Sequence, residues 1–332
     1  MATSGGGHGS VAREAGLKTI TIVGGGIIGS SWALVFARAG LQVRAFARHE
    51  TVRAGLVARV RAAASSARAI APDVDIDELA ARISVHASLE EALDGCAYVQ
   101  ESIEENLAVK RDMFETLDRL APPHAVIASS TSSIGVSRFA ADLPGRDRCL
   151  VAHPAAPPHL IPVVEIVPAP FTSQAAIDAT FALMRDVGQS PVLVKSEQPG
   201  FVLNRLQGAL LIEMLRVVED GIMSPEDVDK LICDGFGLRW AFLGPLEGVD
   251  LNAPGGIADY LGRYGFMFET LAQERGETRQ VVTDAVVSQL DGALRSRFKL
   301  EDQPRRIAAR DRRMALLRAM RNSLGPAGED RS

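Results

Sequence analysis

A histidine and a glutamate form the pair in this sequence that is best suited to moving a proton. His153 follows the apolar run 149–152, and Glu165 interrupts the apolar run 163–167. A carboxylate in such a run must find a partner if it is buried, and a histidine is the obvious one. The carboxylate would fix the tautomer of the imidazole and leave its other nitrogen free to exchange a proton. A purely structural hydrogen bond between the two side chains is the alternative.

A glycine cluster near the start of the chain predicts a dinucleotide-binding turn. The β-branched run 19–23 predicts a strand, and the apolar-periodic run 32–37 predicts a helix after the glycines. The first glycine would allow a tight turn, the second a close approach of backbone N–H groups to a pyrophosphate, and the third close packing of helix on strand. An ordinary glycine-rich loop is the alternative. The residues that we expect at the phosphates are Gly24, Gly26, Ile27, Ile28 and Gly29.

The end of the second strand bears on the choice of dinucleotide. In NAD-selective sites an Asp or Glu at this point accepts hydrogen bonds from the adenosine ribose. This chain has Ala47 and Arg48 there instead. An arginine can pair with a 2′-phosphate, and no carboxylate is present to repel one. NADP(H) is therefore favoured, with NAD(H) as a possible cofactor. A solvated loop arginine is the alternative for Arg48.

The composition is that of an ordinary globular protein. Of the 332 residues, 47% are hydrophobic and 23% are charged, and the formal net charge of −5 argues against nucleic-acid binding as a main task. The three cysteines, Cys96, Cys149 and Cys233, are too widely spaced for a structural zinc site, so we expect no metal and a reducing cytoplasm. The chain contains no uninterrupted run of about 18 apolar residues, so the sequence predicts no membrane span.

The pattern of the chain changes near residue 200. Before this point, strand and helix patterns alternate and predict an α/β fold with a doubly wound sheet, and after it the periodicity is helical. We expect an N-terminal Rossmann-like dinucleotide-binding domain over residues 17–198 and an all-helical substrate and dimerisation domain over residues 199–322, joined at Pro199-Gly200. Residues 1–16, rich in Gly, Ser and Ala, predict a disordered tail, and residues 323–332 a flexible one.

A hydroxyl-rich turn stands at residues 129–133, directly after the buried run 125–128. Open α/β sheets bind their ligands at the carboxyl ends of strands, where this turn would lie. Capping of a following helix could use one or two of the hydroxyls but hardly all of them. The turn is therefore a candidate for contacts with a ligand.

Several motifs stand in a characteristic order along the chain. They are residues 24–29, residues 101–107 with Lys110, residues 129–133, residues 153–154, Glu165, and residues 199–205, 236–247 and 250–253. Together they resemble the 3-hydroxyacyl-CoA dehydrogenase superfamily and, within it, the lambda-crystallin or L-gulonate 3-dehydrogenase branch; residues 236–247 also resemble carnitine dehydrogenases. The likeness covers about residues 18–270 and implies an NAD(P)-dependent dehydrogenase acting on CH–OH groups.

The resemblance assigns a role to each residue of the expected catalytic set. It implies that His153 is the acid/base and Glu165 its orienting partner. It implies that Ser132 and Asn204 hydrogen-bond the substrate oxygen at the reacting carbon, with Ser132 also near the cofactor. These roles are chemically sensible, because a base must take the hydroxyl proton as hydride leaves, while neutral donors polarise the new carbonyl.

Two further positions, Glu105 and Lys110, match family residues near the cofactor ribose, and a surface ion pair is the alternative for them. The chain departs from the family at the end of the second strand, and also at Ala156, where an Asn is usual.

Arg239 is the clue to the substrate, because a guanidinium in the cleft could clamp a carboxylate bidentately. A helix-end contact or an ion pair with Glu247 is the alternative for Arg239.

We therefore expect an enzyme that interconverts a 3-hydroxy acid, or a 3-hydroxyacyl derivative, and its 3-oxo form by hydride transfer with a His–Glu acid/base dyad. One alternative is a ketoreductase acting on a polyketide-like or diketo ester intermediate, which the altered turn at Ala156 would suit. A non-catalytic, crystallin-like structural protein is a further alternative. We expect a small-molecule substrate, a homodimer by analogy, and no nucleic-acid or membrane partner.

Overall fold

The structure is a computed structural model that describes residues 19–68, 72, 74–241, 244–250, 252–253, 256–274 and 299–324. The chain divides into two units. The first runs to Leu206 and includes Arg310–Leu316, and the second contains Gln207–Ala309 and the residues from Leu317 onward. The predicted N-terminal tail and most of the predicted C-terminal tail lie outside the described residues.

The first unit is built on one eight-stranded sheet with the order β3-β2-β1-β4-β5-β6-β7-β8. Neighbouring strands are parallel except at β6 and β7, which pair antiparallel. The first four strands are β1 (Thr19–Val23), β2 (Gln42–Phe46), β3 (Ile83–His86) and β4 (Tyr98–Glu101). The other four are β5 (Val126–Ser129), β6 (Cys149–Pro154), β7 (Val163–Pro168) and β8 (Ser190–Leu193). The predicted doubly wound, Rossmann-like sheet is therefore confirmed.

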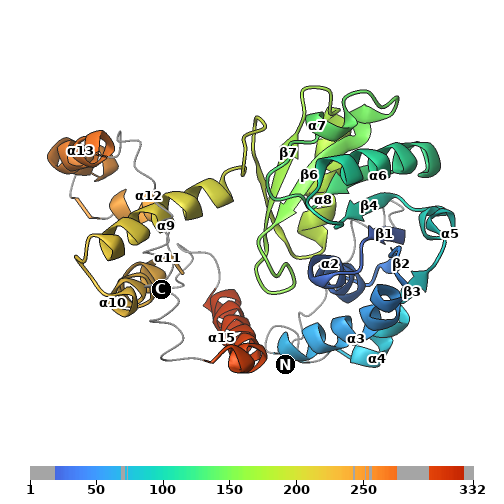
Figure 1. Cartoon of the computed structure of the whole chain (residues 1–332), viewed down its shortest axis with the longest axis horizontal. Coiled ribbons are helices and arrows are strands. Elements are labelled where there is room, and N and C mark those ends of the chain that lie inside the picture. Colours follow the sequence, from blue (N-terminus) through green and yellow to red (C-terminus); the bar gives the residue numbers. More distant parts are fainter. Residues whose placement is uncertain are drawn as a thin grey trace, which may run out of the picture. The chain divides into compact units, whose positions relative to one another are not determined.

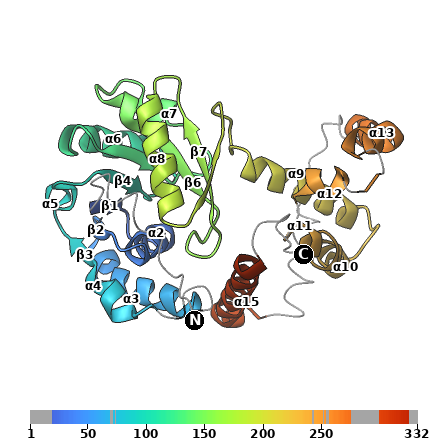
Figure 2. The same cartoon turned by 180° about the vertical axis from the view of Figure 1, so that it is seen from behind.

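Helices cover both faces of this sheet (Figure 1). One face packs against α2 (Ile27–Arg38), α3 (Glu50–Ser66), α4 (Ile76–Ala81) and α8 (Gln174–Asp186), the last of which lies in front of the sheet in Figure 2. The opposite face packs against α5 (Leu89–Leu93), α6 (Leu107–Leu120) and α7 (Ser137–Ala140). A short 3₁₀ turn, η1 (Arg146–Arg148), precedes β6. Because helices cover both faces, the central strands β4, β5 and β6 are buried along their whole length, whereas β2, nearer the edge of the sheet, alternates between buried and more exposed residues.

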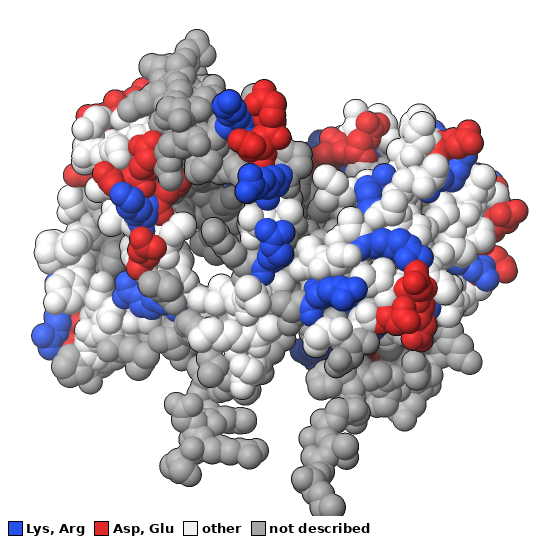
Figure 3. Space-filling model, turned by 90° about the horizontal axis from the view of Figure 1, so that it is seen from below, with Lys and Arg blue, Asp and Glu red and all other residues white. Residues whose placement is uncertain are grey.

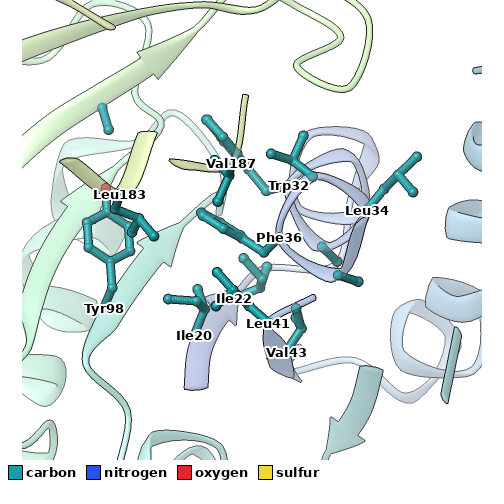
Figure 4. Close-up of a cluster of buried hydrophobic side chains, with 14 of the residues drawn as sticks. Ile20, Ile22, Trp32, Leu34, Phe36, Leu41, Val43, Tyr98, Leu183 and Val187 are labelled. Carbon is teal, nitrogen blue, oxygen red and sulfur yellow. The ribbon is translucent and has the colours of Figure 1, made fainter. Parts of the chain in front are cut away.

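The core on the α2 face is centred on aromatic side chains (Figure 4). The rings of Trp32 and Phe36 stack with their centroids 5.5 Å apart, and the Tyr98 ring lies 6.3 Å from that of Phe36. Ile20 and Ile22 of β1 point into the same cluster. This packing fixes α2 against β1 and so sets the geometry of the glycine turn between them.

The second unit is helical. Helix α9 (Leu203–Glu219) begins in the first unit and continues into the second. Ser224 caps α10 by accepting a hydrogen bond from the backbone N–H of Asp227, as the Ser-Pro-Glu-Asp sequence predicts. The remaining elements are α10 (Pro225–Lys230), the π-helical η2 (Leu231–Gly237), α11 (Leu238–Trp240), α12 (Pro245–Asp250), α13 (Gly256–Glu274), η3 (Leu300–Asp302) and α15 (Gln303–Leu324).

The start of α6 has a local cause. The helix begins at Leu107 because the Asn106 side chain accepts hydrogen bonds from the backbone N–H groups of Ala108 and Val109 and so caps it there. No helix in the described part of the chain is long and apolar enough to cross a membrane.

The glycine turn yields a matched pair of substitutions. A Cβ at Gly29 would overlap the carbonyl oxygen of Gly24, whereas a Cβ at Gly26 would meet nothing within 4 Å. We expect Gly29→Ala to lower the free energy of unfolding by at least about 1–3 kcal/mol, the usual cost of overpacking, and Gly26→Ala to change it little. Denaturant unfolding of both variants checks this, and equal stability of the two would contradict the packing described here.

Candidate active site

His153 and Glu165 face each other across the one antiparallel pair of the sheet. They are direct partners in the β6–β7 register, and His153 Nδ1 lies 2.8 Å from Glu165 Oε2. Both side chains are buried, at 7% and 4% exposure. Direct cross-strand partners point to the same side of the sheet, so the register itself brings the two together. The predicted contact between them is present, and it uses Nδ1 of the imidazole.

The second oxygen of Glu165 holds the start of α9. Glu165 Oε1 accepts hydrogen bonds from the backbone N–H groups of Val202 and Leu203, each at 2.9 Å. The first amides of a helix have no partner within the helix, and a carboxylate there also interacts favourably with the helix dipole. One buried carboxylate therefore orients the histidine and caps the helix that leads into the second unit.

The residue before this cap has an unusual backbone. Phe201 has φ of 50°, in the left-handed region, and follows Gly200 with φ of 74°. Its side chain is fully buried, with the ring centroid 5.5 Å from that of His153. Left-handed backbone is costly for an aromatic residue, so the surrounding contacts must hold it. The turn at residues 200–201 places an apolar ring against the imidazole while it aims the following amides at Glu165.

The first turn of α9 also reaches the hydroxyl-rich turn. Asn204 Nδ2 donates a hydrogen bond to the backbone carbonyl of Ser132 at 2.9 Å. Ser132, His153, Glu165 and Asn204 are thereby linked through α9, although they come from distant parts of the sequence. The structure brings the whole predicted catalytic set together within the first unit.

Glu105 organises the hydroxyl-rich turn from the other side. Its Oε1 accepts hydrogen bonds from the Thr131 hydroxyl at 2.6 Å, from the Ser133 amide and hydroxyl at 3.0 Å each, and from the Ser132 amide at 3.1 Å. Partial burial alone would raise the pKa of Glu105, but the bonds from Thr131 and Ser133 and the charge of Lys110 outweigh it and hold the pKa below its ordinary value of 4.5. The turn is therefore held by an ionised carboxylate at neutral pH.

Lys110 is buried, so the ion pair that it forms with Glu105 is present but does not lie on the surface. Its ammonium lies 3.0 Å from Glu101 Oε1, 3.1 Å from Glu101 Oε2 and 3.7 Å from Glu105 Oε2, with only 1% exposure. Glu101 also accepts from the Ser129 hydroxyl at 2.5 Å and from the Ile103 amide at 2.6 Å. A fully paired cluster of this kind fixes the carboxyl ends of β4 and β5. A cofactor contact by Glu105 or Lys110 stays a prediction.

The glycine turn has the features that a pyrophosphate requires. Gly24 has φ of 106°, and Gly26 has open space where a side chain would be. Helix α2 has no side-chain cap and no acid in its first turn, and Ile27 is largely exposed. The amides of its first turn are thus available to an anion at the carboxyl edge of β1. The residues present fit a dinucleotide.

Arg48 and Arg239 lie at exposed positions. Ala47, which stands where the family has an acid, is buried, and the Arg48 side chain has no hydrogen-bond or ion-pair partner among the described residues. Arg239 belongs to the second unit, and its guanidinium lies 6.0 Å from the centre of the Phe236 ring. Phe236 in turn stacks on Trp240. The side chain of Glu247 is not among those described, so the alternative that Arg239 pairs with Glu247 lies outside the described residues.

Sequence reasoning missed the contacts that involve backbone groups. Phe201 and the capping of α9 by Glu165 carry no local signature beyond the Pro-Gly before them. The sequence indicated Glu101 only as part of a motif, although a carboxylate at the end of an apolar strand indicates a buried partner.

Among the described residues, no group of His, Cys, Asp and Glu could hold a metal ion. Burial raises the pKa of the Cys149 thiol to about 12, so this cysteine is not a nucleophile.

A glycine turn at the carboxyl end of β1 in a mostly parallel sheet, with a buried His–Glu pair on β6 and β7 of the same sheet, defines a dinucleotide-binding dehydrogenase followed by a helical domain. The chain belongs to the 3-hydroxyacyl-CoA dehydrogenase family. Residues 19–197 match the family's NAD-binding domain, and residues 200–293 match its C-terminal domain. It is accordingly an oxidoreductase that uses a nicotinamide cofactor.

Known relatives cover nearly the whole chain. The lambda-crystallin homolog of Bos taurus is 39% identical over 300 residues, which is 88% of this chain and 90% of that one. The L-carnitine dehydrogenase of Streptomyces coelicolor is 33% identical, over 95% of this chain and 98% of the relative. The predicted superfamily and its lambda-crystallin-like branch are thereby confirmed.

A solved structure of an enzyme is similar over almost the full length. It is the NAD⁺-dependent dismutase 5-formyl-3-hydroxy-2-methylpyridine 4-carboxylic acid 5-dehydrogenase, with a TM-score of 0.77 and 26% sequence identity. The similarity covers 93% of this chain and 99% of that chain. This chain thus shares its fold, over almost its whole length, with an NAD⁺-dependent enzyme.

The double role of Glu165 predicts two different losses of stability. Glu165→Ala leaves the imidazole and both α9 amides without an acceptor, and we expect it to lower the free energy of unfolding by about 3–5 kcal/mol, as when one partner of a buried pair is removed. Glu165→Gln keeps an oxygen for the amides and should cost less. Glu197, a partly exposed carboxylate that accepts from the Ser137 amide at 2.9 Å, is the control.

Glu197→Ala should cost only about 1 kcal/mol, the usual value for a lost cap. Denaturant unfolding of the three variants measures the differences. If Glu165→Ala were as mild as Glu197→Ala, Glu165 could not be holding both the histidine and the helix.

Proposed function

We propose that the protein interconverts a 3-hydroxy acid, or a 3-hydroxyacyl derivative, and the corresponding 3-oxo compound, with His153 and Glu165 as the acid/base dyad. The observation that carries this proposal is the buried contact of 2.8 Å between His153 Nδ1 and Glu165 Oε2. It directs Nε2 of the imidazole to the substrate, and no described residue forms a hydrogen bond with that nitrogen. Membership of a dehydrogenase family supplies the reaction class.

In the oxidation, His153 Nε2 takes the proton of the substrate hydroxyl, and the Glu165 carboxylate stabilises the imidazolium that forms. The Ser132 hydroxyl and the Asn204 amide hydrogen-bond the substrate oxygen and polarise it as it becomes a carbonyl. A nicotinamide cofactor bound at the glycine turn would supply the hydride acceptor for this reaction, or the hydride donor for its reverse. The buried Phe201 ring packs beside the imidazole, with the two ring centroids 5.5 Å apart.

We propose that the cofactor is NADP(H) rather than NAD(H). The backbone amides of the turn between Gly24 and Gly29 would hold the pyrophosphate. The second strand ends in buried Ala47 and exposed Arg48, which removes the acid that NAD-selective sites use and supplies a cation for a 2′-phosphate. Glu105 would contact the ribose, and Lys110 would act through Glu105, because its own ammonium is buried.

The substrate is proposed to carry a free carboxylate, bound by Arg239. The Arg239 guanidinium is exposed and forms no ion pair with a described residue, and its position over the Phe236 ring preserves its planar edge for a bidentate contact. It follows a π-helical turn, a backbone form that is frequent at functional sites. An uncharged polyketide-like or diketo ester would make no use of this contact, and the ketoreductase alternative depends on such a substrate.

A non-catalytic, crystallin-like role stays the alternative from a different class, because a lambda-crystallin homolog is among the relatives. Four mutually linked polar residues at one site argue for catalysis instead, since a purely structural protein has no physical need for them. These residues are Ser132, His153, Glu165 and Asn204.

We further propose a cytoplasmic homodimer with a small-molecule substrate and no nucleic-acid or membrane partner. Helix α13 exposes Leu261, Tyr264, Phe268 and Leu271 at helical spacing, an apolar stripe that a second copy would cover. The net charge is −5, and on the face drawn in Figure 3 basic and acidic side chains are interspersed. All three cysteines are free thiols, as a reducing compartment allows.

The dyad predicts the effect of replacing the histidine. We expect His153→Gln to lower turnover by on the order of 10²-fold or more, the usual contribution of a general base, while cofactor binding is kept. Steady-state rates with 3-oxo acids, their CoA thioesters and diketo esters, together with cofactor titrations, measure this. His124→Gln, at an exposed histidine of the same unit, is the control and should leave the rate unchanged. Full turnover of His153→Gln would remove this residue from the mechanism.

The proposed carboxylate contact predicts a split between substrate classes. Arg239→Leu should raise KM for 3-hydroxy acids by at least tenfold, about 1.4 kcal/mol, and leave KM for uncharged esters nearly unchanged. Arg239→Lys should restore binding only in part, because it keeps the charge but not the planar fork. Equal losses for acids and esters, with a lower melting temperature, would show that Arg239 supports the fold instead.

A further inference from the structure

A second arginine reaches the end of β2. Arg53, in the first turns of α3, donates from Nη1 to the backbone carbonyls of both Ala47 and Arg48, at 2.8 and 2.7 Å. It is partly buried, and its remaining guanidinium donors form no hydrogen bond with a described residue. Two consecutive carbonyls held by one nitrogen fix the backbone on which the Arg48 side chain is mounted. Arg53 is thus placed by the fold at the strand end where adenosine riboses bind.

We propose that Arg53 is a second specificity-determining residue, which binds the 2′-phosphate of NADP(H) together with Arg48. The inference rests on the proposed preference for NADP(H) and extends it to a two-arginine site. A guanidinium fastened through one nitrogen still presents its other N–H groups in a fixed plane, which suits a phosphate. Little side-chain entropy is then lost on binding, because the fold has already ordered Arg53.

The other charged groups at this strand end leave the balance positive. His49 is the N-cap residue of α3 and makes no side-chain cap, so the first amides of this 17-residue helix and the positive end of its dipole face the same place. Glu50, exposed in the first turn, is the one acid there and opposes an anion. Two guanidiniums against one solvated carboxylate favour a dianionic phosphate over the bare hydroxyl of NAD(H).

The same helix offers an internal comparison. Arg59 lies further along α3 and donates to the carbonyls of Val52 and Gly25, at 2.6 and 2.7 Å, and to the Ser30 hydroxyl at 3.3 Å. Arg59 therefore supports the glycine turn, which would hold the pyrophosphate that NADPH and NADH share. Arg61, by contrast, is exposed and pairs with Asp77 away from both places. Helix α3 thus carries three arginines, and we expect the loss of each to affect the binding of NADPH and NADH differently.

The test is the binding of NADPH, NADH and 2′,5′-ADP to the purified protein, measured by fluorescence titration or calorimetry. We expect the unmodified protein to prefer NADPH. Arg53→Ala and Arg48→Ala should each weaken NADPH and 2′,5′-ADP by about tenfold or more, in the range of a lost charge-assisted bond, and NADH by less than about twofold. Arg53→Lys should recover part of the loss. Arg59→Ala should weaken both dinucleotides alike, and Arg61→Ala neither.

The outcomes separate the inference from the function on which it rests. If Arg53→Ala weakens NADPH and NADH equally while Arg48→Ala is selective, the NADP(H) preference stands and the role of Arg53 is overturned. If the unmodified protein prefers NADH, both are overturned. Thermal unfolding of each variant accompanies the titrations, and Arg53→Lys keeps the test decisive if Arg53→Ala does not fold. A selective loss in Arg53→Lys or Arg53→Ala supports the two-arginine site.

Discussion

The Glu165 carboxylate is the interaction on which the rest of the structure depends. Removing a charge from water is costly, and a buried carboxylate is tolerated only when its oxygens are fully hydrogen-bonded. Here one oxygen contacts the imidazole of His153 and the other receives two amides at the start of α9. The same atom group therefore sets the tautomer of the histidine, the direction of the helix and the left-handed turn at Phe201. None of the three can change alone.

A second buried charge cluster supports the other side of the site. Glu101 and Lys110 neutralise each other at the ends of the central strands, and Lys110 extends this charge pairing to Glu105. Glu105 then holds the turn that contains Ser132, and Asn204 holds the carbonyl of the same residue from α9. The hydroxyl-rich turn is thus fixed from two directions before any ligand arrives. Such prior ordering reduces the cost of aligning groups around a reacting oxygen.

The residues that could be predicted from the sequence are those whose side chains conflict with their surroundings. Glu165 stands in an apolar strand, and that conflict alone pointed to His153. The glycines at residues 24–29 predicted the dinucleotide-binding turn, because their spacing between a strand and a helix has few other physical explanations. Lys110 could have been recognised as buried, because it lies on the helical face of Phe114 and Leu117. The antiparallel pairing of β6 and β7 and the capping of α9 could not be predicted, because backbone donors leave no mark on residue type.

The residues of the proposed acid/base site and their supports all lie between Glu101 and Asn204, before α9 enters the second unit. The two halves of the chain are therefore under different constraints. A substitution in the helical half touches none of the contacts among these ionisable groups, whereas loss of the Glu165 carboxylate removes its contacts with the imidazole and with the start of α9 at once. If the helical half binds the substrate as proposed, it can adapt to new substrates by small steps while the groups that handle the proton stay the same.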